Sequence, residues 1–362
     1  MSALPADGAA MPVDPPRPSR RLSLTSVLWL GALLVLVSFV TASARGAYAI
    51  GFADILKTLW AALTGGLDGS ADELVFLNIR LPRLLLGLAA GAGLGMAGAL
   101  MQGLFRNPLA DPGLIGVSSG AALAAGGAIV LGSLYFPELP RALGSWTLVL
   151  MAFAGSLAVT VLIYLLAQSE GGTRVGLMAL AGVAINALAG AGLGYLTFLA
   201  SDEQLRSIQF WLLGSLGGAR WSSVLLVGGI VVVAGVAALT CARPLNVIAL
   251  GEAQAVLMGV DVERTKRRAI AITALAVGAI TATTGMIGFV GLLSPHCVRL
   301  VAGPDHRMVI PGSAMLGAAL VLLADSVART AVQPAELPLG VLTAFVGVPF
   351  FLFLLRQFRG RV

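Results

Sequence analysis

The chain has 362 residues, of which 58% are hydrophobic and 11% charged, and its mean hydropathy is +0.94. Soluble domains carry about 25% charged residues, so this composition excludes a soluble globular protein and indicates a chain that faces lipid. The formal charge of +6 therefore indicates membrane topology rather than nucleic-acid binding.

Lysine is rare, and its positions exclude one energy source. It occurs only at Lys57 and Lys266, and neither follows a glycine. The loop that cradles the phosphates of ATP needs a Gly-Lys pair, because the lysine reaches the terminal phosphates. This chain cannot hydrolyse ATP through such a loop, so an ATPase that drives it must be another polypeptide.

The chain divides into two short tails and one long apolar domain. Residues 1–23, rich in proline and arginine, predict a disordered cytoplasmic tail, residues 24–358 a transmembrane domain, and residues 359–362 a cytoplasmic tail. A membrane span needs about 20 apolar residues. Ten windows of this kind follow one another: Leu24–Ser43, Arg83–Leu104, Gly113–Leu131, Trp146–Ala167, Gly176–Leu199, Ser222–Cys241, Ala269–Thr284, Met286–Val301, Val309–Ala328 and Leu339–Arg356.

An even number of spans places both termini on one side. With the N-terminus in the cytoplasm, the inner loops and tails hold more arginine and lysine than the outer loops, as the positive-inside rule requires. The two windows that flank Gly285 are short. Fusing them would move several arginines outside, so we keep them separate.

Small residues dominate two of the windows, at residues 87–100 (GLAAGAGLGMAGAL) and 182–196 (GVAINALAGAGLGYL). Small residues let helix backbones approach closely, and packing is the main source of attraction between helices in lipid. A tightly packed bundle and a smooth wall along a path are both consistent with these runs. The sequence predicts both.

Enzymatic and metal sites are disfavoured. Residues 116–120 match G-x-S-x-G, but that motif needs a strand–turn–helix context and a nearby histidine and acid. The only histidines, His296 and His306, lie far along the chain, and catalytic zinc usually takes three protein ligands. Cys241 and Cys297 lie in or beside apolar runs and are interpreted as buried thiols.

The loop at residues 243–268 (RPLNVIALGEAQAVLMGVDVERTKRR) is the most informative polar segment. Leu245–Leu250 and Ala253–Met258 predict two short amphipathic helices, which Gly251 and Gly259 cap or turn. Such helices could rest on lipid at the inner face. They could equally form a docking surface for a cytoplasmic partner, and the residues alone leave both readings open.

Four segments carry a family resemblance. Residues 80–121 (RLPRLLLGLAAGAGLGMAGALMQGLFRNPLADPGLIGVSSGA), 249–260 (ALGEAQAVLMGV), 285–329 and 336–356 resemble the iron-chelate, haem and cobalamin permease family of ABC importers. The motifs occur in the family's order, and the resemblance covers nearly everything after residue 45.

The resemblance implies an all-α membrane fold with about ten transmembrane helices and two short cytoplasmic coupling helices per subunit. It also implies a homodimer in the bacterial inner membrane, two copies of a cytoplasmic ATPase that bind ATP and Mg, and a periplasmic binding protein outside. No cofactor is expected on this chain. The residues expected to couple to the ATPase are Leu250, Gly251, Glu252, Ala253, Gln254, Met258 and Gly259.

The resemblance gives three outer arginines, Arg80, Arg83 and Arg329, a role in docking the binding protein. Arginine suits this role because its fork pairs bidentately with carboxylates. The alternative is pairing within the chain, since Asp325 lies four residues before Arg329 and can form an intrahelical ion pair. For Arg329 both are expected.

The cargo is the least determined feature. Residues 179–221 resemble the haem-importing branch more than the cobalamin branch, so haem is the expected cargo, with a ferric siderophore or cobalamin as the alternative. An ion-coupled secondary transporter is disfavoured, because such proteins carry ionisable residues in mid-membrane. The residues expected to line the path are Met96, Met101, Asn186 and Leu193.

Overall fold

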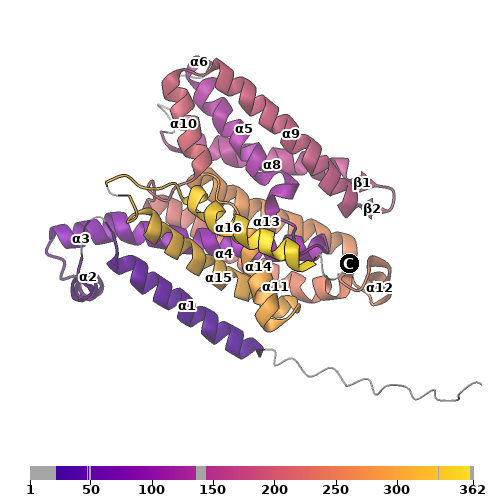
Figure 1. Ribbon diagram of the computed structural model, residues 1–362, viewed down its shortest axis with the longest axis horizontal. Helices are drawn as coiled ribbons and strands as arrows, with labels where there is room; N and C mark the ends of the chain where they lie inside the picture. The colour runs from indigo at the N-terminus through magenta and orange to yellow at the C-terminus, as the bar shows by residue number, and fades with distance from the viewer. Residues whose placement is uncertain (1–21, 47, 49, 136–143, 333, 359–362) are drawn as a thin grey trace, which may run out of the picture.

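The computed structural model describes residues 22–46, 48, 50–135, 144–332 and 334–358, and this part of the chain is almost wholly helical (Figure 1). Ten of its helices are α1 (Leu24–Ala44), α4 (Leu81–Leu104), α5 (Val117–Val130), α8 (Trp146–Leu166), α9 (Val175–Leu199), α11 (Trp221–Ile248), α13 (Val262–Thr284), α14 (Val290–Ala302), α15 (His306–Ala328) and α16 (Leu339–Phe358). Each predicted window coincides with one of them.

The remaining elements connect these helices, and most of these connecting elements lie outside the apolar windows. They are α2 (Phe52–Thr64), α3 (Ala71–Val75), the π-helix η1 (Phe76–Arg80), the 3₁₀-helix η2 (Pro112–Ile115), α6 (Gly132–Tyr135), α10 (Asp202–Leu213), α12 (Glu252–Leu257), and strands β1 (Gln168–Ser169) and β2 (Gly172–Thr173). The strands pair antiparallel as a small hairpin, with Gln168 opposite Thr173.

Among the described residues, 6 helical runs are long and apolar enough to cross a membrane. They are α1, the continuous run Ala71–Leu104 that ends in α4, α8, α9, α11 and α15. Helices α5 and α14 are shorter, and α13 begins with a charged turn. Length and composition therefore support fewer complete spans than the ten predicted.

Helix ends follow from caps and glycines. The Ser23 side chain accepts a hydrogen bond from the Ser26 amide at 3.1 Å and begins α1, as is typical of N-caps. Gly116 has a φ of 79°, which breaks the window Gly113–Leu131 into η2 and α5. Gly285, with a φ of 71°, ends α13 and confirms that the two flanking windows are separate helices.

Helix α4 lies at the centre of one group and packs against α11, α13, α14 and α15. A Cβ added at Gly91, Gly95 or Gly98 would collide with a backbone carbonyl on a neighbouring helix. Only glycine allows these backbones to approach so closely. The prediction that the small residues of 87–100 mediate close packing is confirmed.

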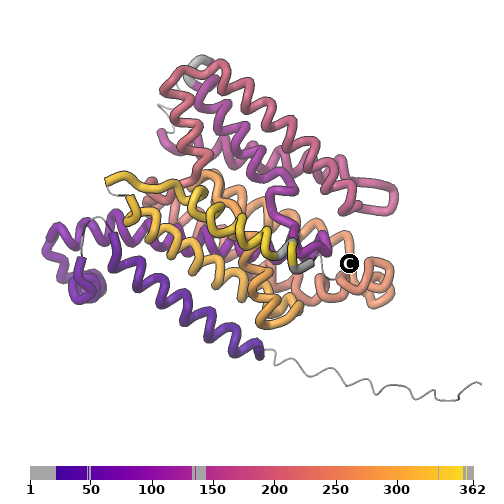
Figure 2. Tube along the Cα trace, in the orientation of Figure 1, coloured from indigo at the N-terminus to yellow at the C-terminus, as the bar shows by residue number. Residues whose placement is uncertain are grey.

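A second group consists of α5, α8, α9 and α10, drawn in magenta and rose at the top of Figure 2. Helix α13 joins the two groups, because it contacts α5 and α8 on one side and α4 and α11 on the other. Helix α9 lies at the edge of its group and contacts α5 and α8.

One predicted element is wrong. Leu245–Leu250 is not a separate short helix, because α11 continues through Pro244 to Ile248. Leu245 and Ile248 are buried, so packing of this face keeps the last turns helical despite the hydrogen bond that proline removes. The loop therefore holds one short helix, α12, and not two.

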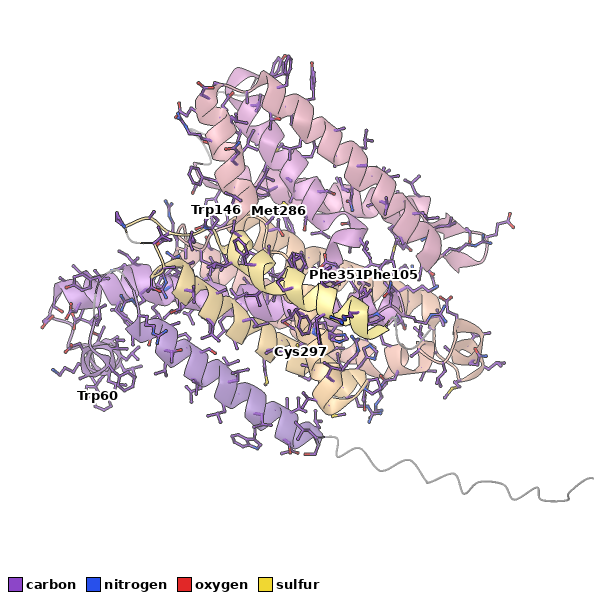
Figure 3. All side chains as sticks on the ribbon, in the orientation of Figure 1. Trp60, Phe105, Trp146, Met286, Cys297 and Phe351 are labelled. Atoms are coloured by element: carbon purple, nitrogen blue, oxygen red, sulfur yellow. The ribbon has the colours of Figure 1, made fainter. Side chains whose placement is uncertain are left out.

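The bundle has two distinct ends. Helices α2 and α3 lie at one end, and α12 and the β1–β2 hairpin lie at the other (Figure 1). Trp60 on α2 points away from the rest of the chain (Figure 3). Of the predicted tails, residues 1–21 and 359–362 lie outside the described residues.

Candidate functional sites

Helix α12 presents an apolar tip to the outside. Its turns depend on two glycines with positive φ, Gly251 at 127° and Gly259 at 78°. Ala255 is buried against Ile248 and Val262. The opposite face exposes three consecutive apolar side chains, Val256, Leu257 and Met258, and the Leu257 side chain is 87% exposed.

The predicted coupling residues lie together around this helix. Leu250, Ala253, Gln254, Met258 and Gly259 are exposed, whereas Gly251 and Glu252 are half-buried. The prediction that Gly251 and Gly259 cap or turn the segment is confirmed. The contact of these residues with an ATPase stays a prediction.

A buried lysine anchors α12 to the rest of the bundle. The Lys266 amine on α13 donates hydrogen bonds to Glu252 Oε2 and to the Thr173 carbonyl oxygen, both at 2.7 Å. Its side chain is only 4% exposed. A buried ammonium is stable only when it is paired and hydrogen-bonded, and these two acceptors, from different segments, meet that need.

Glu263, one turn earlier on α13, makes a second link to the hairpin. It accepts hydrogen bonds from the Thr173 amide at 2.9 Å, the Thr173 hydroxyl at 2.7 Å and the Tyr164 hydroxyl at 3.2 Å. Burial by itself would raise the pKa of Glu263. The hydrogen bonds from Thr173 and Tyr164 and the charge of Lys266 outweigh burial, so the pKa lies below its ordinary value. The carboxylate is therefore ionised at neutral pH.

Sequence reasoning missed this network. In the sequence, Lys266 stands out only because no glycine precedes it, and neither Glu263 nor Thr173 belongs to a recognisable motif. A usable signal existed: a lone lysine followed by two arginines, at the start of a helix that becomes apolar. Its partner Thr173 could not be identified, because the two are far apart in sequence.

The opposite end holds an arginine cluster, which we call the outer cluster: Arg80, Arg83, Asp325, Arg329 and Glu336. The Arg83 Nε atom donates to Asp325 Oδ1 at 3.0 Å, and its two Nη atoms donate to the two Glu336 carboxylate oxygens at 2.8 Å each. This is the bidentate geometry that suits an arginine fork.

The other two arginines of the outer cluster also bind within the chain. Arg329 Nε lies 3.0 Å from Asp325 Oδ2, and its Nη2 donates to the Ala42 carbonyl at 3.1 Å. Arg80 donates to the carbonyl oxygens of Ser43, at 2.9 Å, and Tyr48. The alternative of an intrahelical pair between Asp325 and Arg329 is confirmed.

All three arginines are buried in the isolated chain, whereas the Glu336 side chain is 45% exposed. The hydrogen bond from Arg83 lowers the pKa of Glu336 below its ordinary value. Docking of a binding protein on these arginines stays a prediction. A partner carboxylate would have to compete with acceptors that the chain already supplies.

The residues predicted to line the path are dispersed. Met96 and Met101 are 2% and 0% exposed inside the group around α4, so a path-lining role would require neighbouring helices to separate from α4. Asn186 donates to the Gly113 carbonyl at 3.1 Å and accepts from the Ser119 hydroxyl at 2.6 Å. Leu193 packs in the second group with Val130, Leu196 and Ile208. The assignment stays a prediction.

A cavity of about 800 Å³ opens between α4, α11, α14 and α15, next to Leu250 in the turn that precedes α12. Gln102, Arg299 and His306 line it. The Arg299 guanidinium donates to the Gln102 side chain, and the His306 ring bonds Asn246 at 2.7 Å. No group of three or more His, Cys, Asp or Glu side chains in the described part of the chain could hold a metal ion.

Comparison with known proteins identifies the family. The FecCD transport family matches residues 33–357. The chain belongs to this family. The chain is 43% identical over 333 residues to the hemin transport system permease protein HmuU of Yersinia pestis, which covers 91% of this chain and 96% of HmuU.

Other relatives are named for a different substrate. The cobalamin import system permease protein BtuC of Halobacterium salinarum is 44% identical over 298 residues, covering 82% of this chain and 77% of that protein. A solved structure described as an inward-facing, metal-chelate type ABC transporter has a TM-score of 0.78 at 28% identity, covering 92% of this chain and 100% of that one. This FecCD-family chain is therefore a multi-pass permease of an ABC importer.

Proposed function

We propose that the chain is the permease subunit of a haem importer. It would take haem from a periplasmic binding protein and pass it across the bacterial inner membrane. The observation that carries this proposal is the match to HmuU, which extends over 96% of that permease. The resemblance of residues 179–221 to the haem-importing branch agrees with this match.

Cobalamin is the second candidate, because BtuC of Halobacterium salinarum has a nearly equal identity to this chain. Its match covers 77% of that protein, and this lower coverage is the reason for ranking it second. A ferric siderophore is a further alternative, since the solved structure at 28% identity is described as a metal-chelate type ABC transporter.

The proposed assembly contains two copies of this chain, two ATPase subunits and one binding protein. The end with α12 faces the cytoplasm together with both termini, and the outer cluster faces the periplasm. The exposed apolar tip of α12 suits a socket on the ATPase, since apolar anchors in partner pockets dominate interface energetics. The ATPase subunits would bind ATP and Mg, and haem would be cargo rather than a resident cofactor.

Reconstitution tests this function. The permease would be placed in liposomes with its ATPase, and import of haem and of cobalamin would be measured with each cargo's binding protein outside. We expect ATP-dependent accumulation of haem and none of cobalamin. Cobalamin import alone would replace the proposal by its second candidate. Uptake by the permease without an ATPase, driven by an ion gradient, would contradict the importer mechanism.

A further inference from the structure

The β1–β2 hairpin and α12 meet on the two sides of a single amine. Thr173 ends the hairpin, and Glu252 begins α12, yet both accept a hydrogen bond from Lys266 Nζ at 2.7 Å. Glu263 binds the same Thr173 through both its amide and its hydroxyl. We call Lys266, Glu263, Glu252 and Thr173 the inner clamp.

The hairpin connects two helices of the second group, so the inner clamp links α12 to both of them. The hairpin joins the end of α8, at Leu166, to the start of α9, at Val175. Glu263 also accepts from Tyr164 on the last turn of α8. The inner clamp therefore ties α12 to both helices of the second group that meet at the hairpin.

The clamp resists separation for an electrostatic reason. Pulling the hairpin away from α13 would leave the buried Lys266 ammonium with one acceptor fewer and Glu263 without its Thr173 donors. Removing one partner of a buried charged hydrogen bond is costly, because the remaining charge is left uncompensated. The intact network therefore favours movement of its segments as one body.

We infer that α12 and the hairpin move as one rigid unit, and that Lys266 and Glu263 are positioning residues that carry a displacement of α12 to the ends of α8 and α9. This rests on the proposed function, in which a cytoplasmic ATPase pushes or pulls α12. A displacement of α12 would then move α9, at the edge of the second group, through the hairpin that precedes its first residue, Val175.

Substitutions in the clamp should separate ATP hydrolysis from transport. In the reconstituted complex, Lys266→Met and Glu263→Gln should lower cargo moved per ATP hydrolysed by about fivefold or more, the lower end of a typical coupling free energy. Basal ATPase activity and complex assembly should be unchanged. The matched control is Arg267→Gln, because Arg267 is exposed and lies 3.9 Å from Glu263. Wild-type transport per ATP in both clamp variants would overturn the inference.

Cross-linking tests the rigid unit directly, without disturbing clamp residues. Gly171 on the hairpin and Ala253 on α12 line the same groove. In a Cys241→Ser and Cys297→Ser background, the side chains introduced by Gly171→Cys and Ala253→Cys would be joined by a bifunctional maleimide. The control sample carries monofunctional maleimide on both cysteines, which adds bulk without a link.

If the two segments move together, the linked complex transports as well as the control. Loss of transport only in the linked sample would show that they separate during the cycle and would overturn the inference. Import by the unmodified complex reports on the proposed function. The ratio of linked to control sample reports on the clamp, so the two failures are distinguishable.

Discussion

Helices α4 and α9 have nearly the same composition and opposite surroundings. Both contain a long run of glycine and alanine, at residues 87–100 and 182–196. In the helical run that ends in α4, 83% of the most apolar window is buried within the chain, whereas in α9 the share is 17%. Similar runs of small residues therefore occur in a buried central helix, α4, and in a largely exposed helix, α9.

A run of small residues therefore predicts close packing but does not identify what packs against it. The partners of α4 are helices of its own chain. The exposed face of α9 carries large apolar side chains, including Leu180, Val183 and Phe198, next to small ones. In the proposed homodimer this face would meet lipid, cargo or the second copy.

The largest expected effect comes from the charged end of α4. Arg83→Met leaves Asp325, which is 2% exposed, with Arg329 alone, and should lower the free energy of unfolding by about 3 kcal/mol. Arg206→Met, at an exposed position on α10, should change it by less than about 0.5 kcal/mol. Thermal unfolding in detergent measures both, and equal melting temperatures would show that the outer cluster does not stabilise α4.

The second prediction places one substitution on each helix. Gly98→Ala puts a Cβ against the Gly291 carbonyl and should destabilise the fold by about 1–3 kcal/mol through overpacking. Gly190→Ala on α9 meets nothing within 4 Å and should be neutral or slightly stabilising, because alanine is the better helix former. Similar melting temperatures for the two variants would contradict the conclusion that α4 is closely packed within the chain and α9 is not.

The third prediction concerns the partner of α9. Ala187→Trp, at an exposed position amid the large side chains of this face, should weaken self-association of the permease about tenfold, or about 1.4 kcal/mol. Its melting temperature as a subunit should not change. Val236→Trp, on the exposed face of α11, is the control. A dimer fraction that is unchanged by mass photometry would remove α9 from the proposed dimer interface.

The smallest effect is a pH dependence at the outer cluster. Because the pKa of Glu336 lies below its ordinary value of 4.5, its ionised form stabilises the fold above that pH. The contribution is lost as pH falls through the lowered pKa. Since Glu336 is half-exposed, the loss should be at most about 1 kcal/mol. Melting temperatures measured from neutral pH down to about pH 3 should therefore fall more steeply for the wild type than for Glu336→Gln, and equal slopes would contradict this contribution.

Much of the fold could be predicted from the sequence. Apolar windows located ten of the helices, because hydropathy is a local property, and the distribution of arginines correctly kept the two windows that flank Gly285 separate. Helices α2 and α10 were missed because charged residues interrupt their apolar residues, Asp54 and Lys57 in α2 and Asp202, Glu203 and Arg206 in α10. The extension of α11 past Pro244 depends on burial of Leu245 and Ile248, which is a tertiary effect.

The sites were predictable only where one segment carries them. The turn at Gly251 and Gly259 and the pair Asp325–Arg329 are local, and both are present. Glu336 pairs with Arg83, which lies 253 residues away in the sequence. Lys266 pairs with Thr173, which lies 93 residues away. Composition and spacing carry no information about such pairings.

The central place of α4 has a consequence for biosynthesis. Helix α15, its main neighbour, begins at His306, about 200 residues after α4 ends at Leu104. At typical rates of roughly 5–20 residues per second, α4 spends roughly 10–40 s in the bilayer before α15 emerges. It must therefore be accepted by the insertion machinery before its main neighbour exists, and only later become an interior helix. This explains why a helix that ends up shielded from lipid keeps the apolar surface of one that faces it.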